Sequence, residues 1–454
     1  MSVIGFDVGN SKCVIATCLQ GAIDVMLNDE SNRETPSVIC FGEKQRFLGS
    51  AGASSASKFP NSTYYNIKSS LALGDTPTTV NFLSKTYEFS PTEMMAMIFS
   101  HLKQIAERRL NTEVSNCVIG IPSYFKEKHR RAYLNAAKIA GLNPLRLLHD
   151  CTAAALSYGI YKRETSIVAF VDIGHCDTQV SIVSFKEDEM RVLSHSSDPS
   201  LGGRDFDEVM FNHFSKEFKE KHNIDVSSNA KASKRLRSAC EKMKTVLSVN
   251  SEAPLSIEEF MNVEEVKGEM KREKFESLCW DLLIRIAVPC ARAVSDSGVP
   301  LSRIDSVEVI GSGSRVPSVS KVIASVFRKE PSRTLNGSEC VAMGCAMQCQ
   351  ILTARNIGRK YEIRDSFPFS IEIASNELFK RRESFPASKI QKFQQKVPFQ
   401  IDICYPGDEK LNTITVDVED SENTDGENPL VELRFELDAN GIVKVFSEEG
   451  IVET

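Results

Sequence analysis

A strand–turn–strand pattern that occurs twice constrains this chain more than any other feature. In residues 2–19, SVIGFDVGNSKCVIATCL, an apolar run ends at Asp7, a short turn follows, and a second run alternates in hydropathy. Residues 167–185, IVAFVDIGHCDTQVSIVSF, repeat this plan with Asp172 before the turn. Backbone N–H groups in such a turn can cradle phosphate, and the leading Asp can hold Mg²⁺ through water. One Asp-x-Gly turn is common, whereas two, each opening a similar half, predict a split nucleotide site.

Composition excludes several classes of protein. The 454 residues are 41% hydrophobic and 26% charged, as in a soluble globular protein of several domains or subdomains. A net charge of −6 gives no electrostatic basis for a nucleic-acid partner, and no apolar run reaches the roughly 18 residues that span a membrane. The 13 cysteines are scattered without zinc-site spacing. We therefore expect free, packed thiols and a cytoplasmic location, with the nucleus as a second compartment.

A change in periodicity divides the chain into two predicted domains. Residues 1–365 mix strand and helix patterns and predict an α/β domain with lobe I at about 1–163 and lobe II at about 164–355. Residues 366–454 predict a β-rich domain, because FPFSIEI, VPFQIDICY, NTITVDVED and LVELRFELDANGIVKVFS alternate at period two. Within it, DANG is typical of a hairpin turn, and EDSENTDGEN is expected to be a solvated acidic loop.

Local patterns inside the α/β domain predict further elements. Ser90, Pro91 and Glu93 suit the N-cap, the first turn and the capping box of a helix. Residues 41–89 are rich in Ser, Gly and Thr, and they predict a small irregular subdomain. Residues 205–280 are charged and predicted to be largely helical, with a strongly basic face on one helix.

Turn residues are the candidates for nucleotide contacts. Gly9 lets the backbone approach a phosphate, Asn10 tolerates left-handed geometry, and Ser11 completes the first turn. Two more glycine-containing turns are candidate backbone contacts to phosphate or nucleoside: Gly202-Gly203 and Gly311-Ser312-Gly313-Ser314-Arg315. A plain strand–helix turn is the alternative interpretation of the last segment.

The number and order of the motifs make a family resemblance specific. The chain resembles the ATPase domain of the heat shock protein 70 (Hsp70) superfamily at GFDVGN, IGIPSYF, AGLNPLRLLHDCTAAALSYG, VDIGH, SLGGRDFDEVMFNHF, RLRSACEKMKTVLS, VEVIGSGSRVP and NGSECVAMGCAMQCQIL. It resembles the large Hsp110 branch at NDESNRETPSVICFGEKQRFLG, at DIGH, and at FPFSIEI, which no Leu-rich linker precedes. The resemblance is close over about 1–370 and weak in the β domain, where ELRFELDANGIVKV matches best.

This resemblance implies an actin-like, two-lobed ATPase fold with ATP and Mg²⁺ in the cleft, followed by a small β-sandwich-like domain. Asp7 and Asp172 would face the water shell of the metal. The phosphates would be held by the turn residues Gly9, Asn10, Ser11, Gly174 and His175, and the remaining nucleotide contacts would come from Gly202, Gly203, Gly311, Ser312, Ser314 and Arg315.

The resemblance also implies a catalytic set and an adenosine pocket. Lys68 matches the lysine that orients the attacking water. The expected catalytic set consists of Lys68, Asp150 and Asp172. Asp150 stands where the family has a glutamate, so its shorter arm would leave a water or metal contact unmade. Thr245 replaces an arginine that stacks on adenine, a loss of about 1 kcal/mol. The residues matching the adenosine pocket share one helix face and are Glu241, Lys244 and Ser248.

The second turn departs from the glycine-rich turn of folding chaperones. His175 and Cys176 replace glycines, Asp177 replaces a threonine near the γ-phosphate, and Gln179 replaces an aspartate. Two like charges 4 Å apart repel by about 4 kcal/mol at an effective dielectric of 20, and phosphoryl transfer depends on positive charge and N–H donors. We therefore expect ATP binding with very slow or absent hydrolysis. The alternative is that His175 points to solvent and hydrolysis survives.

Two further departures affect the expected function. The segment after Lys68 is shorter than in the family, and the chain reaches Thr454 with no helical lid. The first hypothesis is a nucleotide-exchange co-chaperone whose partner is the ATPase domain of an Hsp70 heat-shock chaperone. The alternatives are an ATP-independent holdase that binds unfolded polypeptides, an active ATP-dependent folding chaperone, and a degenerate paralogue. A sugar kinase shares the fold but should lack SLGGRDFD and the β domain.

Overall fold

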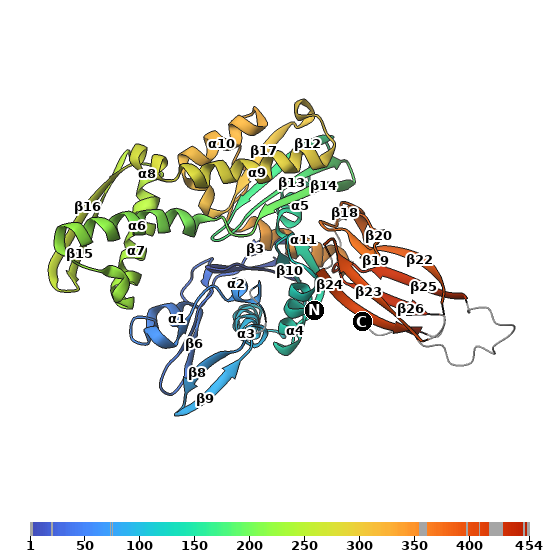
Figure 1. Cartoon of the computed structure of the whole chain (residues 1–454), viewed down its shortest axis with the longest axis horizontal. Helices are drawn as coiled ribbons and strands as arrows, with labels where there is room; N and C mark the ends of the chain where they lie inside the picture. The colour runs from blue at the N-terminus through green and yellow to red at the C-terminus, as the bar shows by residue number, and fades with distance from the viewer. Residues whose placement is uncertain are drawn as a thin grey trace.

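The two hairpins form the centres of two sheets, one in each lobe. This computed structural model describes residues 3–19, 21–72, 74, 76–353, 361–395, 398–407, 409–416, 430–447 and 450–451. Figure 1 shows lobe I in blue and teal below, lobe II in green and yellow above, and the β domain in orange and red to one side. The predicted α/β class with a following β domain is confirmed.

The sheet of lobe I has the order β11-β10-β1-β2-β3, and β4 pairs with β2. Its strands are β1 (Ile4–Val8), β2 (Lys12–Leu19), β3 (Ala22–Val25), β4 (Thr35–Pro36), β10 (Asn116–Ile121) and β11 (Asn143–His149). Because β1, β10 and β11 run parallel, their carboxyl ends lie at one edge of the sheet. That edge carries Asp7 in β1 and Asp150 directly after β11.

Helices cover this sheet, and their ends follow local signals. They are α3 (Pro91–Leu110), α4 (Glu127–Ile139), α5 (Asp150–Gly159) and α11 (Cys340–Leu352). The capping box of α3 is confirmed, since Ser90 Oγ accepts a hydrogen bond from the Glu93 N–H and the Glu93 carboxylate accepts one from the Ser90 N–H. α4 stops before Gly141, which has a φ of +71°. No helix in the described ranges is long and apolar enough to cross a membrane.

The sheet of lobe II has the order β17-β12-β13-β14-β18-β21. Its strands are β12 (Ser166–Ile173), β13 (Thr178–Lys186), β14 (Glu189–Asp198), β17 (Ser306–Ile310), β18 (Glu362–Ser366) and β21 (Ser384–Phe385). In the β12–β13 hairpin, Asp172 pairs with Gln179. α9 (Trp280–Ser297) and α10 (Pro317–Phe327) lie on the outer face of this sheet in Figure 1. The predicted domain boundary at residue 366 falls at the last residue of β18.

The outer part of lobe I contains more regular secondary structure than the sequence suggested. Residues 41–89 were expected to be irregular, but they contain β5 (Ile39–Phe41), β6 (Arg46–Leu48), α1 (Gly49–Ser55), β7 (Thr63–Tyr64), α2 (Ile67–Ala72), β8 (Thr78–Phe82) and β9 (Lys85–Phe89). Rings of Phe41, Tyr64, Phe82 and Phe89 pack together there. The aromatic contacts join short strands that have little periodicity of their own.

The prediction that residues 205–280 are largely helical is wrong for residues 252–271. α6 (Gly203–His222) and α7 (Ala230–Leu247) are helical as expected, but β15 (Glu252–Phe260) and β16 (Val263–Lys271) form a hairpin before α8 (Arg272–Leu278). Ala253, Leu255 and Ile257 face inward at period two. This period-two pattern was the local signal that could have identified the hairpin.

The β domain contains two four-stranded sheets, β20-β19-β23-β24 and β22-β25-β26-β27. Their strands are β19 (Ile371–Ile373), β20 (Asn376–Phe379), β22 (Ala387–Gln394), β23 (Phe399–Tyr405), β24 (Glu409–Val416), β25 (Leu430–Leu437), β26 (Val443–Ser447) and β27 (Gly450–Ile451). DANG is the β25–β26 turn as predicted, with Gly441 at a φ of +71°. β22 was not expected, and the acidic EDSENTDGEN segment lies outside the described residues.

The β domain packs on lobe I through the β25–β26 turn and β23. Arg130 Nη1 donates to the Asn440 carbonyl at 3.0 Å, and the Leu147 N–H donates to Asn440 Oδ1 at 2.9 Å. Glu127 accepts from the Val443 N–H at 3.0 Å, and its own N–H donates to the Tyr405 hydroxyl at 2.9 Å. These contacts place the β domain against α4 and β11, the elements that lead into Asp150.

Candidate functional site

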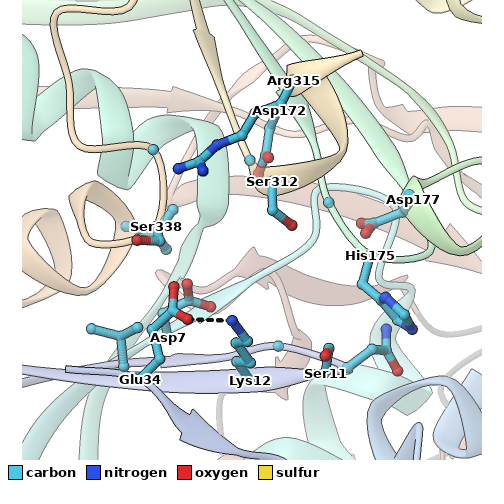
Figure 2. A pocket seen from close by; sticks show the side chains of 18 of the residues that line it. Asp7, Ser11, Lys12, Glu34, Asp172, His175, Asp177, Ser312, Arg315 and Ser338 are labelled. Carbon is cyan, nitrogen blue, oxygen red and sulfur yellow. Dashed lines mark hydrogen bonds and ion pairs between the residues drawn. The ribbon is translucent and has the colours of Figure 1, made fainter. Parts of the chain in front are cut away.

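A cavity of about 400 Å³ lies between the two lobes, within the usual range of ligand sites. In Figure 2, Asp7, Ser11 and Lys12 come from the strand and turn of lobe I below, while Asp172, Ser312 and Arg315 come from lobe II above. The predicted residues that line it are Asp7, Gly9, Asn10, Ser11, Lys68, Asp150, Asp172, Gly174, His175, Gly203, Glu241, Lys244, Ser248, Gly311, Ser312 and Arg315. The structure thus brings together residues more than 300 positions apart in the chain.

The first turn is closed by a hydrogen bond from the Gly9 N–H to the Lys12 carbonyl, 3.0 Å long. A Cβ at Gly9 would lie 2.5 Å from that carbonyl oxygen, so only glycine fits the turn. Asp7, at the end of β1, and Ser11 line the cavity on either side of it. Lys12 also lines the cavity, and its ammonium pairs with Glu34 at 2.5 Å.

The second turn repeats this geometry with different side chains. The Gly174 N–H donates to the Asp177 carbonyl at 2.9 Å, as Gly9 does to Lys12. His175 lines the cavity, which argues against the alternative that it points to solvent. Burial, together with Lys244 and Arg204, lowers the pKa of His175 to about 4. The imidazole is therefore neutral at pH 7 and supplies no positive charge to a phosphate.

Lys68 is the buried cation at the phosphate end of the cavity. It lies in α2, and its Nζ is 3.8 Å from Asp150 Oδ2. Burial alone would lower the pKa of Lys68, but the surrounding acidic groups, Asp150 foremost, outweigh burial and raise it. The ammonium is therefore charged and faces Asp150. Its role in orienting the attacking water stays a prediction.

Carboxylates outnumber cations around Lys68. Asp7, Asp150, Asp172 and Asp177 all line this end of the cavity. Burial and the neighbouring Asp150 raise the pKa of Asp7 to about 7, and burial with Asp177 raises the pKa of Asp172. Burial also raises the pKa of Asp177. Burial is the first cause of each shift, and Asp150 or Asp177 adds to it. A divalent cation bound through water would favour the charged forms of these carboxylates.

Gln179 connects the carboxylates of the two lobes. Its Oε1 accepts from the Ser123 N–H at 2.8 Å, and because a backbone N–H only donates, the amide NH₂ must point the other way. That NH₂ lies 3.1 Å from Asp150 Oδ2 and 3.2 Å from Asp177 Oδ2. Asp177 also takes a hydrogen bond from Tyr124. The sequence marked Gln179 only as a replaced aspartate and did not predict this bridge.

The opposite end of the cavity is formed by α7 and the turn after β17. Glu241, Lys244 and Ser248 line it from one face of α7, as predicted. Lys244 Nζ donates to Asp207 at 2.6 Å and to the Gly203 carbonyl at 2.7 Å. Burial raises the pKa of Asp207 to about 6, although Lys244 opposes the shift. This end offers a helix face and polar groups suited to a nucleoside.

Two predicted residues lie behind the cavity wall. A Cβ at Gly202 would be 2.4 Å from the Cys176 nitrogen, so this glycine lets α6 approach the second turn. Ser314 is fully buried, donates to the Gly311 carbonyl at 2.7 Å and accepts from Arg333. Both support the turns from behind and do not face a ligand.

Several lining residues were not predicted. Asp207 lies one helical turn after Gly203, so the SLGGRDFD motif was the signal that could have identified it. Lys12 follows the first turn directly. Glu34 lies in the NDESNRETP segment, and Gly337 and Ser338 lie in the NGSE segment. Neither motif was assigned to the site, because only the packing of distant loops brings these residues to the cavity.

The donor set fits ATP with a water-mediated Mg²⁺. Two glycine turns present backbone groups, and Asp7 and Asp172 face each other across the cavity from different lobes. Among the described residues, the His, Cys, Asp and Glu ligand atoms that cluster within 4.8 Å are those of His149, His195 and Asp365, outside this cavity. The role of Asp7 and Asp172 toward Mg²⁺ through water stays a prediction.

The His149 cluster holds a proton and not a metal ion. Arg130 Nη2 lies 2.8 Å from His149 Nε2, and a guanidinium can only donate. The neutral imidazole then carries its proton on Nδ1, 3.0 Å from Asp365 Oδ2. A metal ion would need the lone pair of that Nδ1 nitrogen. His195 Nε2 contacts the other carboxylate oxygen of Asp365 at 2.9 Å.

Comparison with known protein families identifies the chain. The family model described as Hsp70 protein matches residues 3–453. This chain belongs to the Hsp70 family. The two-lobed, actin-like ATPase fold expected from the motifs is that of this family, whose members are chaperones that bind ATP with Mg²⁺.

Relatives support the predicted similarity to the large branch. The chain is 47% identical to heat shock 70 kDa protein 16 of Arabidopsis thaliana, over 98% of this chain and 64% of that protein. It is 36% identical to the 97 kDa heat shock protein of Strongylocentrotus purpuratus and 35% identical to heat shock 70 kDa protein 4 of Canis lupus familiaris. It covers 55% and 59% of these two relatives, so it spans well under two thirds of each.

Proposed function

We propose that this chain binds ATP and Mg²⁺ with little or no hydrolysis and acts as a nucleotide-exchange co-chaperone of an Hsp70 heat-shock chaperone, in the cytoplasm or nucleus. The observation that carries this proposal is the placement of Asp177 beside Lys68 and Asp150 at the phosphate end of the cavity. A fixed carboxylate there opposes the charge that develops in phosphoryl transfer.

The proposed binding of ATP uses groups that the substitutions in the second turn do not alter. Gly9, Ser11 and Gly174 would contact phosphates through the two turns, while Lys244 and Arg315 line the nucleoside end. Bound ATP would touch both lobes and would stabilise the folded chain against unfolding by mass action. Catalysis is disfavoured because His175 is neutral and Lys68 already faces several carboxylates.

The first experiment combines calorimetry with Mg·ATP and a phosphate-release assay on the same sample. We expect saturable binding that Lys68→Ala weakens and Lys58→Ala, at an exposed site outside the cavity, leaves unchanged. We expect phosphate release close to the buffer background. Turnover comparable to that of an Hsp70 folding chaperone would contradict the structural-ATP proposal.

The exchange role needs its own assay. Labelled ADP is loaded on an Hsp70 folding chaperone, and its release is followed with and without this chain and Mg·ATP. Faster release supports the proposal. Unchanged release, with ATP binding already demonstrated, would contradict the exchange role while leaving the binding site in place.

A holdase is the second candidate, favoured by apolar residues exposed on the β domain. Ile390 in β22 is 55% exposed and Leu430 in β25 is 64% exposed. Their strand partners are Arg434 and Gln394, so Ile390 and Leu430 lie on the same face of the sheet. Suppressed aggregation of a denatured client without ATP, lost in Ile390→Ser/Leu430→Ser, would support this function.

A further inference from the structure

Side chains of the second turn and of β13 tie the two lobes together at the base of the cleft. Gln179 belongs to β13 of lobe II, yet it accepts from the Ser123 N–H and donates to Asp150, both in lobe I. Gln179 and Asp150 are 2% and 5% exposed. The amide NH₂ of Gln179 lies between the carboxylates of Asp150 and Asp177, which would repel each other, and it can donate a hydrogen bond to each. The amide therefore favours contact between the lobes at this point.

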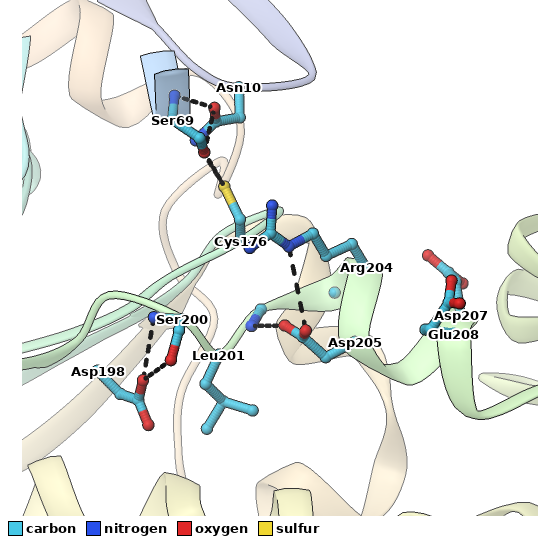
Figure 3. A network of polar contacts seen from close by, with 12 residues as sticks. Asn10, Ser69, Cys176, Asp198, Ser200, Leu201, Arg204, Asp205, Asp207 and Glu208 are labelled. Carbon is cyan, nitrogen blue, oxygen red and sulfur yellow. Dashed lines mark hydrogen bonds and ion pairs between the residues drawn. The ribbon is translucent and has the colours of Figure 1, made fainter. Parts of the chain in front are cut away.

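A second connection between the lobes joins the first turn and the second turn. Figure 3 shows Cys176 of lobe II meeting Asn10 and Ser69 of lobe I. Asn10 Nδ2 donates to Cys176 Sγ, and Asn10 Oδ1 accepts from both the N–H and the hydroxyl of Ser69 at 2.8 Å. Ser69 Oγ is itself 3.5 Å from Cys176 Sγ. The side chain that replaces a glycine in this turn therefore contacts the opposite lobe directly.

The second turn is also held from behind. The Gly203 N–H donates to the Gly174 carbonyl and the Arg204 N–H donates to the His175 carbonyl, both at 2.9 Å. The start of α6 thus fixes the position of the turn within lobe II, so that Cys176 is held in place for its contacts with lobe I. Figure 3 places Arg204 and Asp205 beside this turn.

A third connection crosses the rim of the cleft. Lys234 on α7 of lobe II donates to the Tyr65 hydroxyl of lobe I at 2.6 Å, and its ammonium lies 5.0 Å from the centre of the Tyr65 ring. All three connections are made between protein atoms. Each of these hydrogen bonds favours the arrangement of the lobes that makes it.

We infer that the closed arrangement of the lobes is held by the protein's own side chains, with Gln179 as the central positioning residue, so that closure does not require bound nucleotide. Bound ATP then occupies a cleft that is already closed and adds little to closure. The consequence that partner engagement is independent of ATP rests on the proposed exchange function, whereas closure itself does not.

The test is hydrogen exchange of the full chain, freed of nucleotide, with and without Mg·ATP. Peptides covering residues 64–72 and 172–182 report on the two sides of the closed cleft. For the native chain we expect exchange rates within about threefold in the two states. Exchange at least about tenfold faster without nucleotide, equivalent to about 1.4 kcal/mol, would overturn the inference.

Variants separate the bridge from general stability. Gln179→Met keeps length and removes the amide, so we expect faster exchange without nucleotide and recovery with Mg·ATP. Thr178→Val is the matched control, because the Thr178 hydroxyl bonds the Leu201 carbonyl within lobe II. Cys176→Gly removes the second connection and should act in the same direction as Gln179→Met. Equal exchange in Gln179→Met and the native chain would overturn the role of Gln179.

The two proposals fail in different ways. If the nucleotide-free chain is closed but never accelerates ADP release from a partner, the exchange function fails and the inference stands. If ADP release is accelerated only with ATP, and the two peptides of the nucleotide-free chain exchange fast, the inference fails and the exchange function stands.

Discussion

Single residues decide the chemistry of the cleft. Asp177 replaces the threonine expected near the γ-phosphate, and Gly311 is kept where a side chain has no room. The first change adds charge to a buried site, and the second preserves a backbone conformation. Both effects are local enough to be separated by point substitutions with matched controls.

Asp177→Thr should strengthen nucleotide binding, because it removes a carboxylate from the phosphate end of a site that already holds Asp7, Asp150 and Asp172. We expect Mg·ATP affinity to rise at least about tenfold, or about 1.4 kcal/mol, measured by calorimetry. Glu208→Gln is the control, since this exposed glutamate on α6 pairs with Arg237 outside the cavity. An unchanged affinity in Asp177→Thr would show that the carboxylate does not oppose the phosphates.

Gly311→Ala should destabilise the protein and weaken nucleotide binding. Gly311 has a φ of +79°, and an added Cβ would lie 2.3 Å from the Ile173 carbonyl oxygen. Gly298→Ala is matched in backbone strain, because Gly298 has a φ of +68° with nothing within 4 Å. We expect about 1 kcal/mol of destabilisation for Gly298→Ala and clearly more for Gly311→Ala, compared by thermal unfolding. Equal losses would contradict the steric argument.

At the scale of elements, one buried cluster joins three strands. His149 ends β11 of lobe I, His195 lies in β14 of lobe II, and Asp365 lies in β18 of the lobe II sheet, just before the β domain. All three side chains are about 1% exposed. A buried histidine links stability to pH when its pKa differs between the folded and the unfolded chain, and burial lowers the pKa of His149.

Stability should fall as the pH is lowered from about 6.5 to about 4. Burial lowers the pKa of His149 to about 4, although Asp365 opposes this, and an unfolded histidine titrates near 6.5. In that window the unfolded chain takes up a proton that the folded chain does not, so folding loses up to about 3 kcal/mol. His149→Gln should flatten this part of the melting temperature against pH, while exposed His222→Gln should not. Identical pH profiles in His149→Gln and the native chain would contradict this assignment.

At the scale of the whole molecule, the β domain and the nucleotide site share one set of supports. Asn440 in the β25–β26 turn contacts Arg130 and Leu147 of lobe I, and the chain from Leu147 runs directly into Asp150. Movement of the β domain therefore changes the surroundings of the strand that positions a cavity carboxylate.

Asn440→Ala should loosen this interface. It leaves the N–H of Leu147 without its Asn440 Oδ1 partner, at a cost of about 1–3 kcal/mol if the interface stays closed. We expect faster hydrogen exchange in residues 143–149 and in the β25–β26 turn. Asn376→Ala, at the exposed start of β20 elsewhere in the β domain, should leave these peptides unchanged. Unaltered exchange in Asn440→Ala would show that other contacts hold the domains together.

The sequence by itself determined the local features and the family. Asp7, Gly9 and Gly174 carry turn chemistry within a few residues of their strands, the capping box of α3 is complete between Ser90 and Glu93, and the DANG hairpin follows the same logic. These features depend on backbone geometry and neighbouring groups alone, so they can be predicted from a short window.

Only the tertiary structure decided which distant groups meet. Glu34 and Ser338 enter the cavity, the amide of Gln179 spans the lobes, and His149 meets Asp365, although no local pattern indicates that these groups meet. The β15–β16 hairpin was missed although its strands alternate buried and exposed residues, mostly at period two. Contacts of this kind form when whole sheets and helices pack to bury apolar area, and that packing fixes which polar groups face each other.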